Sequence, residues 1–181
     1  QDYTIDSRGD IGAVVREATM ECIADVFSFL VTNNNEKMLK EETVSECFAH
    51  ILQQSVEKID RTRSVAGAVF SRLLLHEPKI PNIPHEDALK KVFGKEIVDE
   101  INWCAPHQTF PLFTKLLELD RYRYNLTLGL MVSIGGLTES TVRYSSESLR
   151  GLLQEKESDK EFLCDFLTCV VRVLKNYQKN D

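Results

Sequence analysis

The stretch from Tyr122 to Ile134 decides the fold class, and it reads Tyr-Arg-Tyr-Asn-Leu-Thr-Leu-Gly-Leu-Met-Val-Ser-Ile. Apolar and aromatic residues alternate strictly with the others, a pattern typical of a half-buried β-strand. No other part of the chain offers a partner strand, and an unpaired strand would leave its backbone polar groups without hydrogen bonds. We therefore predict a buried helix over 122–134, although the local pattern alone does not separate helix from strand.

The segments on either side show the three- and four-residue spacing of amphipathic helices. The first covers 11–31 and has an unusually wide apolar arc, which predicts contact with more than one neighbouring helix. Its apolar residues are Ile11, Val14, Val15, Ala18, Met20, Cys22, Ile23, Val26, Phe27, Phe29 and Leu30. Three asparagines at 33–35 are expected to end this helix, since Asn favours turns and left-handed backbone.

Further helices are predicted along the rest of the chain, which brings the total to seven to nine. No sheet is predicted. They cover 44–59, 60–76, 86–93, 96–101, 110–120, 142–156 and 162–177. Pro78, Pro81 and Pro84 predict an extended connector at about 78–85, because proline lacks an N–H and disfavours helix in the residue before it.

A related pattern recurs in three of these helices. Asp10, Arg16 and Ala18 belong to a D-x-x-x-x-V-R-x-A motif, Asp60 and Arg63 recur in a similar arrangement, and Arg143 follows Val142 in a third. Arginines 47 and 80 positions apart correspond to one and about two units of HEAT or armadillo length. We therefore predict an all-α, HEAT/armadillo-like solenoid of stacked antiparallel helix pairs. We expect residues 1–181 to be one segment of a longer chain. The residues expected to tie neighbouring repeats together are Asp10, Arg16, Asp60 and Arg143.

The charge balance argues against two classes of partner. The chain has 22 Lys and Arg against 28 Asp and Glu, for a net charge of −6, whereas nucleic-acid binding relies on clustered cations. No apolar run is long enough to span a bilayer, so membrane insertion is not expected. Five cysteines without a C-x-x-C motif favour reduced thiols in the cytosol, most of them packed as small hydrophobic residues.

No catalytic, metal or cofactor site is predicted. Cys104 and His107 are the best local metal-ligand pair, but two ligands do not make a site. The turn over 135–140 lacks the lysine of a phosphate-binding loop, so it is interpreted as a helix-to-helix turn with Thr138 as N-cap. No nucleophile motif is present.

Two basic spots are the candidate contact surface. Arg and Tyr are enriched at interface hot spots, although the same residues also occur on ordinary solenoid surfaces. The candidate residues are Arg61, Arg63, Arg121, Tyr122, Arg123 and Tyr124.

Several short stretches, taken in their order along the sequence, resemble the tubulin-folding cofactor D family. These are 2–4, 6–10, 15–16, 57–61, 83–85, 102–106, 122–124 and 135–141, so the likeness covers most of the chain and weakens in the final helix. The resemblance implies a non-catalytic scaffold that acts in β-tubulin capture and in assembly and disassembly of the αβ-tubulin heterodimer.

The partners that the resemblance implies are β-tubulin, cofactors C and E, and an Arf-like small GTPase. GTPase activation would be indirect, and the location would be the cytoplasm, with cytoskeletal or centrosomal association. Two alternatives remain. The chain is a regulatory module that supplies Arg61, Arg63 or Arg123 to a small GTPase, or it is a solenoid scaffold that contacts only adjacent repeats.

Overall fold

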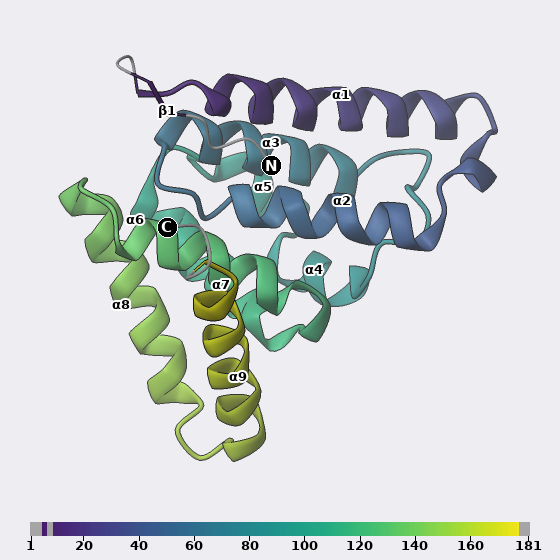
Figure 1. Ribbon diagram of the computed structural model, residues 1–181. Coiled ribbons are helices and arrows are strands. Elements are labelled where there is room, and N and C mark those ends of the chain that lie inside the picture. Colours follow the sequence, from purple (N-terminus) through teal and green to yellow (C-terminus); the bar gives the residue numbers. More distant parts are fainter. Residues whose placement is uncertain (1–4, 7–8, 178–181) are drawn as a thin grey trace.

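A computed structural model describes residues 5–6 and 9–177, and this part of the chain contains nine α-helices (Figure 1). The only sheet in the described residues is a short antiparallel pair, β1 (Ile5–Asp6) with β2 (Gly9–Asp10), in which Ile5 pairs with Asp10. Residues 2–4 and 7–8, which carry part of the family resemblance, lie outside the described residues. The helices are α1 (Gly12–Thr32), α2 (Glu41–Gln54), α3 (Asp60–Leu74), α4 (Glu86–Val92), α5 (Lys95–Glu100), α6 (Pro106–Lys115), α7 (Asp120–Ile134), α8 (Glu139–Glu155) and α9 (Lys160–Tyr177). Two 3₁₀ turns, η1 (Glu36–Met38) and η2 (Leu116–Glu118), complete the list.

The stretch that decides the fold class is a helix, α7, as predicted. Side chains of both alternating sets are buried along it, including Leu126, Thr127, Leu128 and Ser133. Burial on all sides arises because α7 packs against α2, α8 and α9. A helix surrounded in this way needs no polar stripe, so its sequence can alternate as a strand does.

Equivalent helices of successive repeats lie side by side and run parallel. Arg61 near the start of α3 pairs with Glu17 of α1, and Arg72 near its end pairs with Asp25. The starts of α2 and α7 meet in the same way, since Arg121 donates a hydrogen bond to Ser45. Figure 1 shows the resulting stack, with α1 at one end and the α8–α9 hairpin at the other. The prediction of an all-α solenoid is confirmed.

The core is centred on an aromatic cluster where α2, α3, α4 and α6 meet. The rings of Phe70 and Phe93 have centroids 5.0 Å apart, and those of Phe93 and Phe113 are 4.8 Å apart. Residues 75–85, between α3 and α4, contain no helix, and Ile80 in this segment is buried. The segment therefore covers part of the core.

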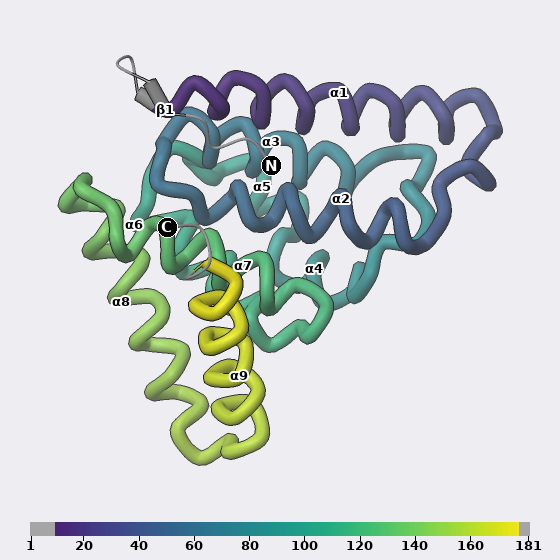
Figure 2. Tube along the Cα trace, viewed as in Figure 1, coloured from purple at the N-terminus to yellow at the C-terminus, as the bar shows by residue number. Residues whose placement is uncertain are grey.

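The first helix ends where the asparagines predict, but only part of its apolar arc is covered. α1 stops at Thr32, and Asn34 has a φ of 55°. Met20 and Phe27 are buried on its inner side, whereas Val26 and Phe29 are 48% and 63% exposed. The tube in Figure 2 shows that no described helix lies beyond α1 at this end of the stack.

Two further properties concern the described part of the chain. None of its helices combines the length and hydropathy that a bilayer crossing requires. All five cysteines are free thiols; Cys22, Cys104 and Cys164 are exposed and the other two half-buried. The expectation that most of them pack as core residues was wrong, because the helical apolar patterns that contain Cys22 and Cys164 continue onto faces that no described helix covers.

Candidate protein-contact surface

Arg63 is a structural residue and is not available on the surface. Its side chain is fully buried, it pairs with Asp60, and it donates a 2.8 Å hydrogen bond to the backbone carbonyl of Glu57. It also reaches the carbonyl of Cys104, and its guanidinium lies 5.3 Å from the centre of the Phe110 ring. The α2–α3 turn is thus joined to the segment that leads into α6. The expectation that Arg63 contacts a partner is corrected by this burial.

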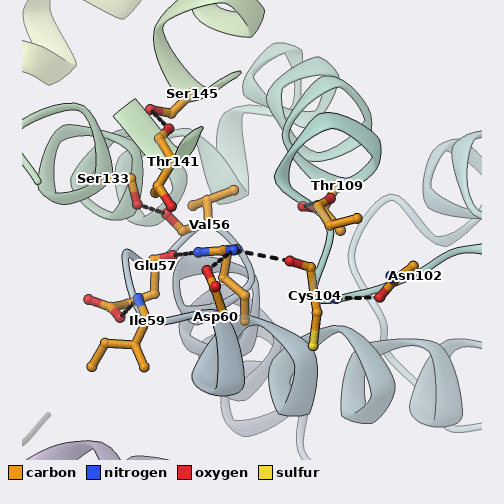
Figure 3. Close-up of polar contacts among 12 residues, drawn as sticks. Val56, Glu57, Ile59, Asp60, Asn102, Cys104, Thr109, Ser133, Thr141 and Ser145 are labelled. Carbon is orange, nitrogen blue, oxygen red and sulfur yellow. Dashed lines mark hydrogen bonds and ion pairs between the residues drawn. The ribbon is translucent and has the colours of Figure 1, made fainter. Parts of the chain in front are cut away.

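The junction between the α2–α3 turn and the segment before α6 contains further buried polar groups, which Figure 3 shows together. Glu57 is completely buried, and one of its carboxylate oxygens accepts a 2.9 Å hydrogen bond from the Ile59 amide. Ser133 of α7 donates a 2.7 Å hydrogen bond to the carbonyl of Val56. Buried polar groups are costly unless they are bonded. These bonds therefore fix how the turn sits against α7.

Arg61, two residues before Arg63, remains accessible. Its side chain is 66% exposed while it forms a 2.7 Å ion pair with Glu17. Glu17 is only 12% exposed, but it also accepts a 2.8 Å hydrogen bond from the Thr62 hydroxyl, so its carboxylate stays bonded when the largely exposed guanidinium turns to a partner.

The residues at the start of α7 are mostly engaged within the chain. Tyr122 is fully buried, and its hydroxyl donates a 2.7 Å hydrogen bond to the carbonyl of Pro84. Burial raises the pKa of Tyr122. Tyr122 therefore anchors the 75–85 segment, and the expectation that it contacts a partner is corrected. Arg121 is half-buried at its bond with Ser45.

Arg123 and Tyr124 connect α7 to α9. Arg123 has a 13% exposed side chain, which pairs with Asp165 at 2.9 Å and donates a 2.8 Å hydrogen bond to the carbonyl of Leu117. Tyr124 accepts a hydrogen bond from Asn176, and the guanidinium of Arg172 lies 4.7 Å from the centre of its ring. Both residues are thus partly buried and engaged with α9.

The residues expected to tie repeats together divide into two groups. Arg16 forms an ion pair with Asp10 and donates a 2.9 Å hydrogen bond to Gln54, so it joins α1 to α2. Asp60 pairs with Arg63, which joins the α2–α3 turn to the segment before α6. Arg143 pairs with Glu147 one turn along the same helix, on an exposed face, and this pair joins no two helices.

The described residues contain no cluster of three or more His, Cys, Asp or Glu side chains that would hold a metal. The turn at 135–138 leads directly into α8, with Thr138 in the N-cap position, as predicted. Between α1 and α2 lies a groove of about 410 Å³. Its apolar walls include Val15, Ile23 and Cys47.

The exposed apolar faces of α1 and α9 were not predicted as contact surfaces. We define the α9 outer face as Cys164, Leu167, Val171, Leu174 and Tyr177. Leu167 is 61% exposed, and Val171, Leu174 and Tyr177 are each about half exposed. The signal was present in the sequence as a second apolar stripe at three- and four-residue spacing, but only the packing shows which stripe is covered. Lone exposed apolar residues are common, whereas a contiguous row marks an interaction surface.

Comparison with known proteins places this solenoid in a family. Residues 45–181 match the family model described as the C-terminal part of tubulin folding cofactor D. The chain belongs to the tubulin folding cofactor D family. It is similar to tubulin-specific chaperone D of Dictyostelium discoideum, with 31% identity over 196 aligned positions that cover 97% of this chain and 13% of that protein.

A second cofactor D relative comes from Schizosaccharomyces pombe, a tubulin-folding cofactor D that is 33% identical over 136 positions. That alignment covers 72% of this chain and 11% of the relative. The chain thus spans about an eighth of the length of the curated family members it matches. No solved structure matches it.

Proposed function

We propose that this chain is a non-catalytic, protein-binding scaffold of a tubulin-folding cofactor, acting in β-tubulin capture and in assembly and disassembly of the αβ-tubulin heterodimer. The observation that carries the proposal is the family match over 45–181, supported by relatives named as a tubulin-specific chaperone and a tubulin-folding cofactor. A solenoid suits this role because its long faces offer a large binding area.

The α9 outer face is the part of the chain that we assign to partner contact. Its apolar row lies next to the cations Arg172 and Lys175 on the same helix, and Tyr124 of α7 lies under Arg172. Tubulin is acidic and this chain carries a net charge of −6, so overall charge opposes the encounter. A local apolar and cationic face overcomes that repulsion, since complementary charges act at short range.

Cofactors C and E and an Arf-like small GTPase are the further partners in this proposal, and any GTPase activation is indirect. We place the protein in the cytoplasm, associated with the cytoskeleton or the centrosome. Binding these partners requires no catalytic residue in the chain, and neither does the proposed location.

A β-tubulin binding assay tests the α9 assignment. The variant Leu167→Glu/Val171→Glu is expected to weaken binding about tenfold or more, since charges would replace the centre of the apolar row. Leu137→Glu is the matched control, because Leu137 is fully exposed in the turn before α8. Equal binding by both variants and the unaltered chain would overturn the α9 assignment, and no binding by the unaltered chain would overturn the tubulin role of this segment.

Regulation of a small GTPase is the second candidate, and the exposure of Arg61 favours it. Arg63 and Arg123 are engaged internally, so Arg61 is the arginine of this set that can reach a nucleotide. Arg61→Glu would then abolish a change in GTP turnover and leave binding largely intact. If the chain binds neither tubulin nor a GTPase, the remaining alternative is a scaffold segment that contacts only adjacent repeats of the solenoid.

A further inference from the structure

A groove of about 440 Å³ lies between α6 and α8, which pack side by side (Figure 1). Each of its walls contains three residues that are spaced one helical turn apart. They are His107, Pro111 and Lys115 on α6, and Glu147, Gly151 and Glu155 on α8. Gly151 leaves the α8 wall open at its middle, since no neighbouring atom lies within 4 Å of a carbon added there. We call this hollow the α6–α8 groove.

Two oxygen atoms on the α6 side of the groove lack their usual partners. Pro111 lies inside α6 and has no N–H, so it cannot donate the usual helical hydrogen bond to the carbonyl of His107. Thr114 lines the groove and is 1% exposed, and its hydroxyl has no hydrogen-bond partner among the described residues. A buried hydroxyl without a bond is costly, and threonine in a helix adopts two χ1 rotamers, so this hydroxyl can turn toward an entering group. The α6 side therefore favours a ligand that brings N–H donors.

The α8 wall places a carboxylate on either side of its open middle. Glu155 forms no ion pair with another described residue. Glu147 is half exposed and pairs with Arg143 through one of its two carboxylate oxygens, at 3.0 Å. The opposite wall has one lysine, Lys115, and it is exposed. The charges and the acceptor atoms of the groove thus complement a cation, and hydrogen bonds from a cation to carboxylates are the strong kind.

We propose that the α6–α8 groove binds an arginine side chain of a partner protein, with the guanidinium between Glu147 and Glu155 and one N–H directed to the Thr114 hydroxyl. Arginine fits because its planar head carries five N–H donors, enough to serve both carboxylates and the hydroxyl together. Its apolar stem passes over Gly151 and Pro111. This site differs from the α9 outer face, whose neighbouring cations suit an acidic partner, so the inference does not depend on tubulin binding.

Titration of the 181-residue chain with short peptides tests the proposal. The probe is the pentapeptide Gly-Ser-Arg-Ser-Gly with blocked ends, and amide NMR shifts report where it binds. Saturable shifts are expected at the amides of Thr114, Lys115 and Gly151. A peptide with glutamate in place of arginine is expected to bind at least tenfold more weakly, because its charge repels the two carboxylates. A peptide with leucine at that position is also expected to bind at least tenfold more weakly, since it has no donor for them.

Two variants of the α8 wall complete the test. Gly151→Leu fills the open middle and is expected to weaken binding of the arginine peptide about tenfold or more. Glu147→Gln/Glu155→Gln keeps the shape of the groove, removes its negative charge and is expected to weaken binding at least fivefold. Leu137→Glu, in the turn before α8, is the matched control and should bind as the unaltered chain does.

Three results would overturn the proposal. They are the absence of saturable shifts at the groove amides, equal affinity for the arginine and glutamate peptides, and unchanged binding by both variants of the α8 wall. Failure of tubulin binding would leave each of these measurements unchanged.

Discussion

Gly129 of α7 packs directly against the backbone carbonyl of Gln53 in α2, at a point where a side-chain carbon would overlap that oxygen. The same carbon would lie 2.7 Å from a methyl group of Val56. Only glycine allows the two helices to approach this closely. The approach brings Asn125 within 3.0 Å of the Gln53 side chain and Ser133 within reach of the Val56 carbonyl.

Gly129→Ala is expected to lower the free energy of unfolding by about 3 kcal/mol, because the overlapping atom belongs to the backbone and cannot rotate away. Gly151→Ala is the matched control. Gly151 lies in α8 with no neighbouring atom within 4 Å of an added carbon, so its replacement is expected to stabilise the chain by about 0.5–1 kcal/mol. Urea unfolding measures both. Equal effects of the two substitutions would contradict the close α2–α7 contact.

Gly67 of α3 has a similar role beneath the Trp103 ring, since a carbon added at position 67 would lie 2.6 Å from Cδ2 of that ring. Gly67→Ala is expected to cost about 2 kcal/mol of stability. In a Trp103→Leu background the same change should cost less than half as much, because the smaller side chain leaves room. A double-mutant cycle gives this coupling, and additive effects would show that the two residues do not meet.

Arg63 and Arg61 lie two positions apart in the sequence, but their replacement is expected to affect stability differently. Arg63→Met is expected to destabilise the chain by about 2–3 kcal/mol, because the carbonyl groups of Glu57 and Cys104 would lose a charged, buried donor. Arg61→Met should cost less than 1 kcal/mol (~0.5–1 kcal/mol), since the Arg61 guanidinium is largely exposed and Glu17 keeps its hydrogen bond from the Thr62 hydroxyl. Thermal unfolding distinguishes them, and a larger loss at Arg61 would contradict the burial pattern.

His50 is expected to make stability depend on pH. Partial burial lowers the pKa of His50 from its ordinary value of 6.5, while Glu46 and the Gln53 side chain act in the opposite direction. The unfolded chain then binds the proton more readily, so stability is full above pH 6.5 and falls as the pH drops from 6.5 toward the lowered folded pKa. The neutral ring also accepts a 3.3 Å hydrogen bond from Asn125, which protonation removes.

Urea unfolding between pH 8 and pH 5.5 measures this dependence. His50→Gln keeps a polar side chain at the position but does not titrate, so it should flatten the curve in this range. A curve that remains as steep in the variant would assign the dependence to other groups.

The sequence alone predicted the helical class correctly, for reasons that are local. Three- and four-residue spacing marks amphipathic helices, and the asparagines at 33–35 end α1 because they tolerate left-handed backbone. The choice of helix for 122–134 followed from pairing, since a single long strand has no partner for its backbone groups. None of these inferences requires knowledge of which helices pack against each other.

The contact surface could not be predicted in this way. Arg63 and Tyr122 resemble interface residues by type, but the structure places them in the interior, where each completes hydrogen bonds between segments about 40 residues apart. Conversely, Phe29 and Leu167 resemble core residues by type and lie on the outside.

The sequence by itself therefore determined that this chain is helical, where α1 ends and that α1 is apolar on more than one side. Only the tertiary structure decided which side is covered, because burial depends on neighbours that lie far away along the chain. Spacing within one helix records how many apolar faces it has, and the packing of the other helices determines which of them remain open.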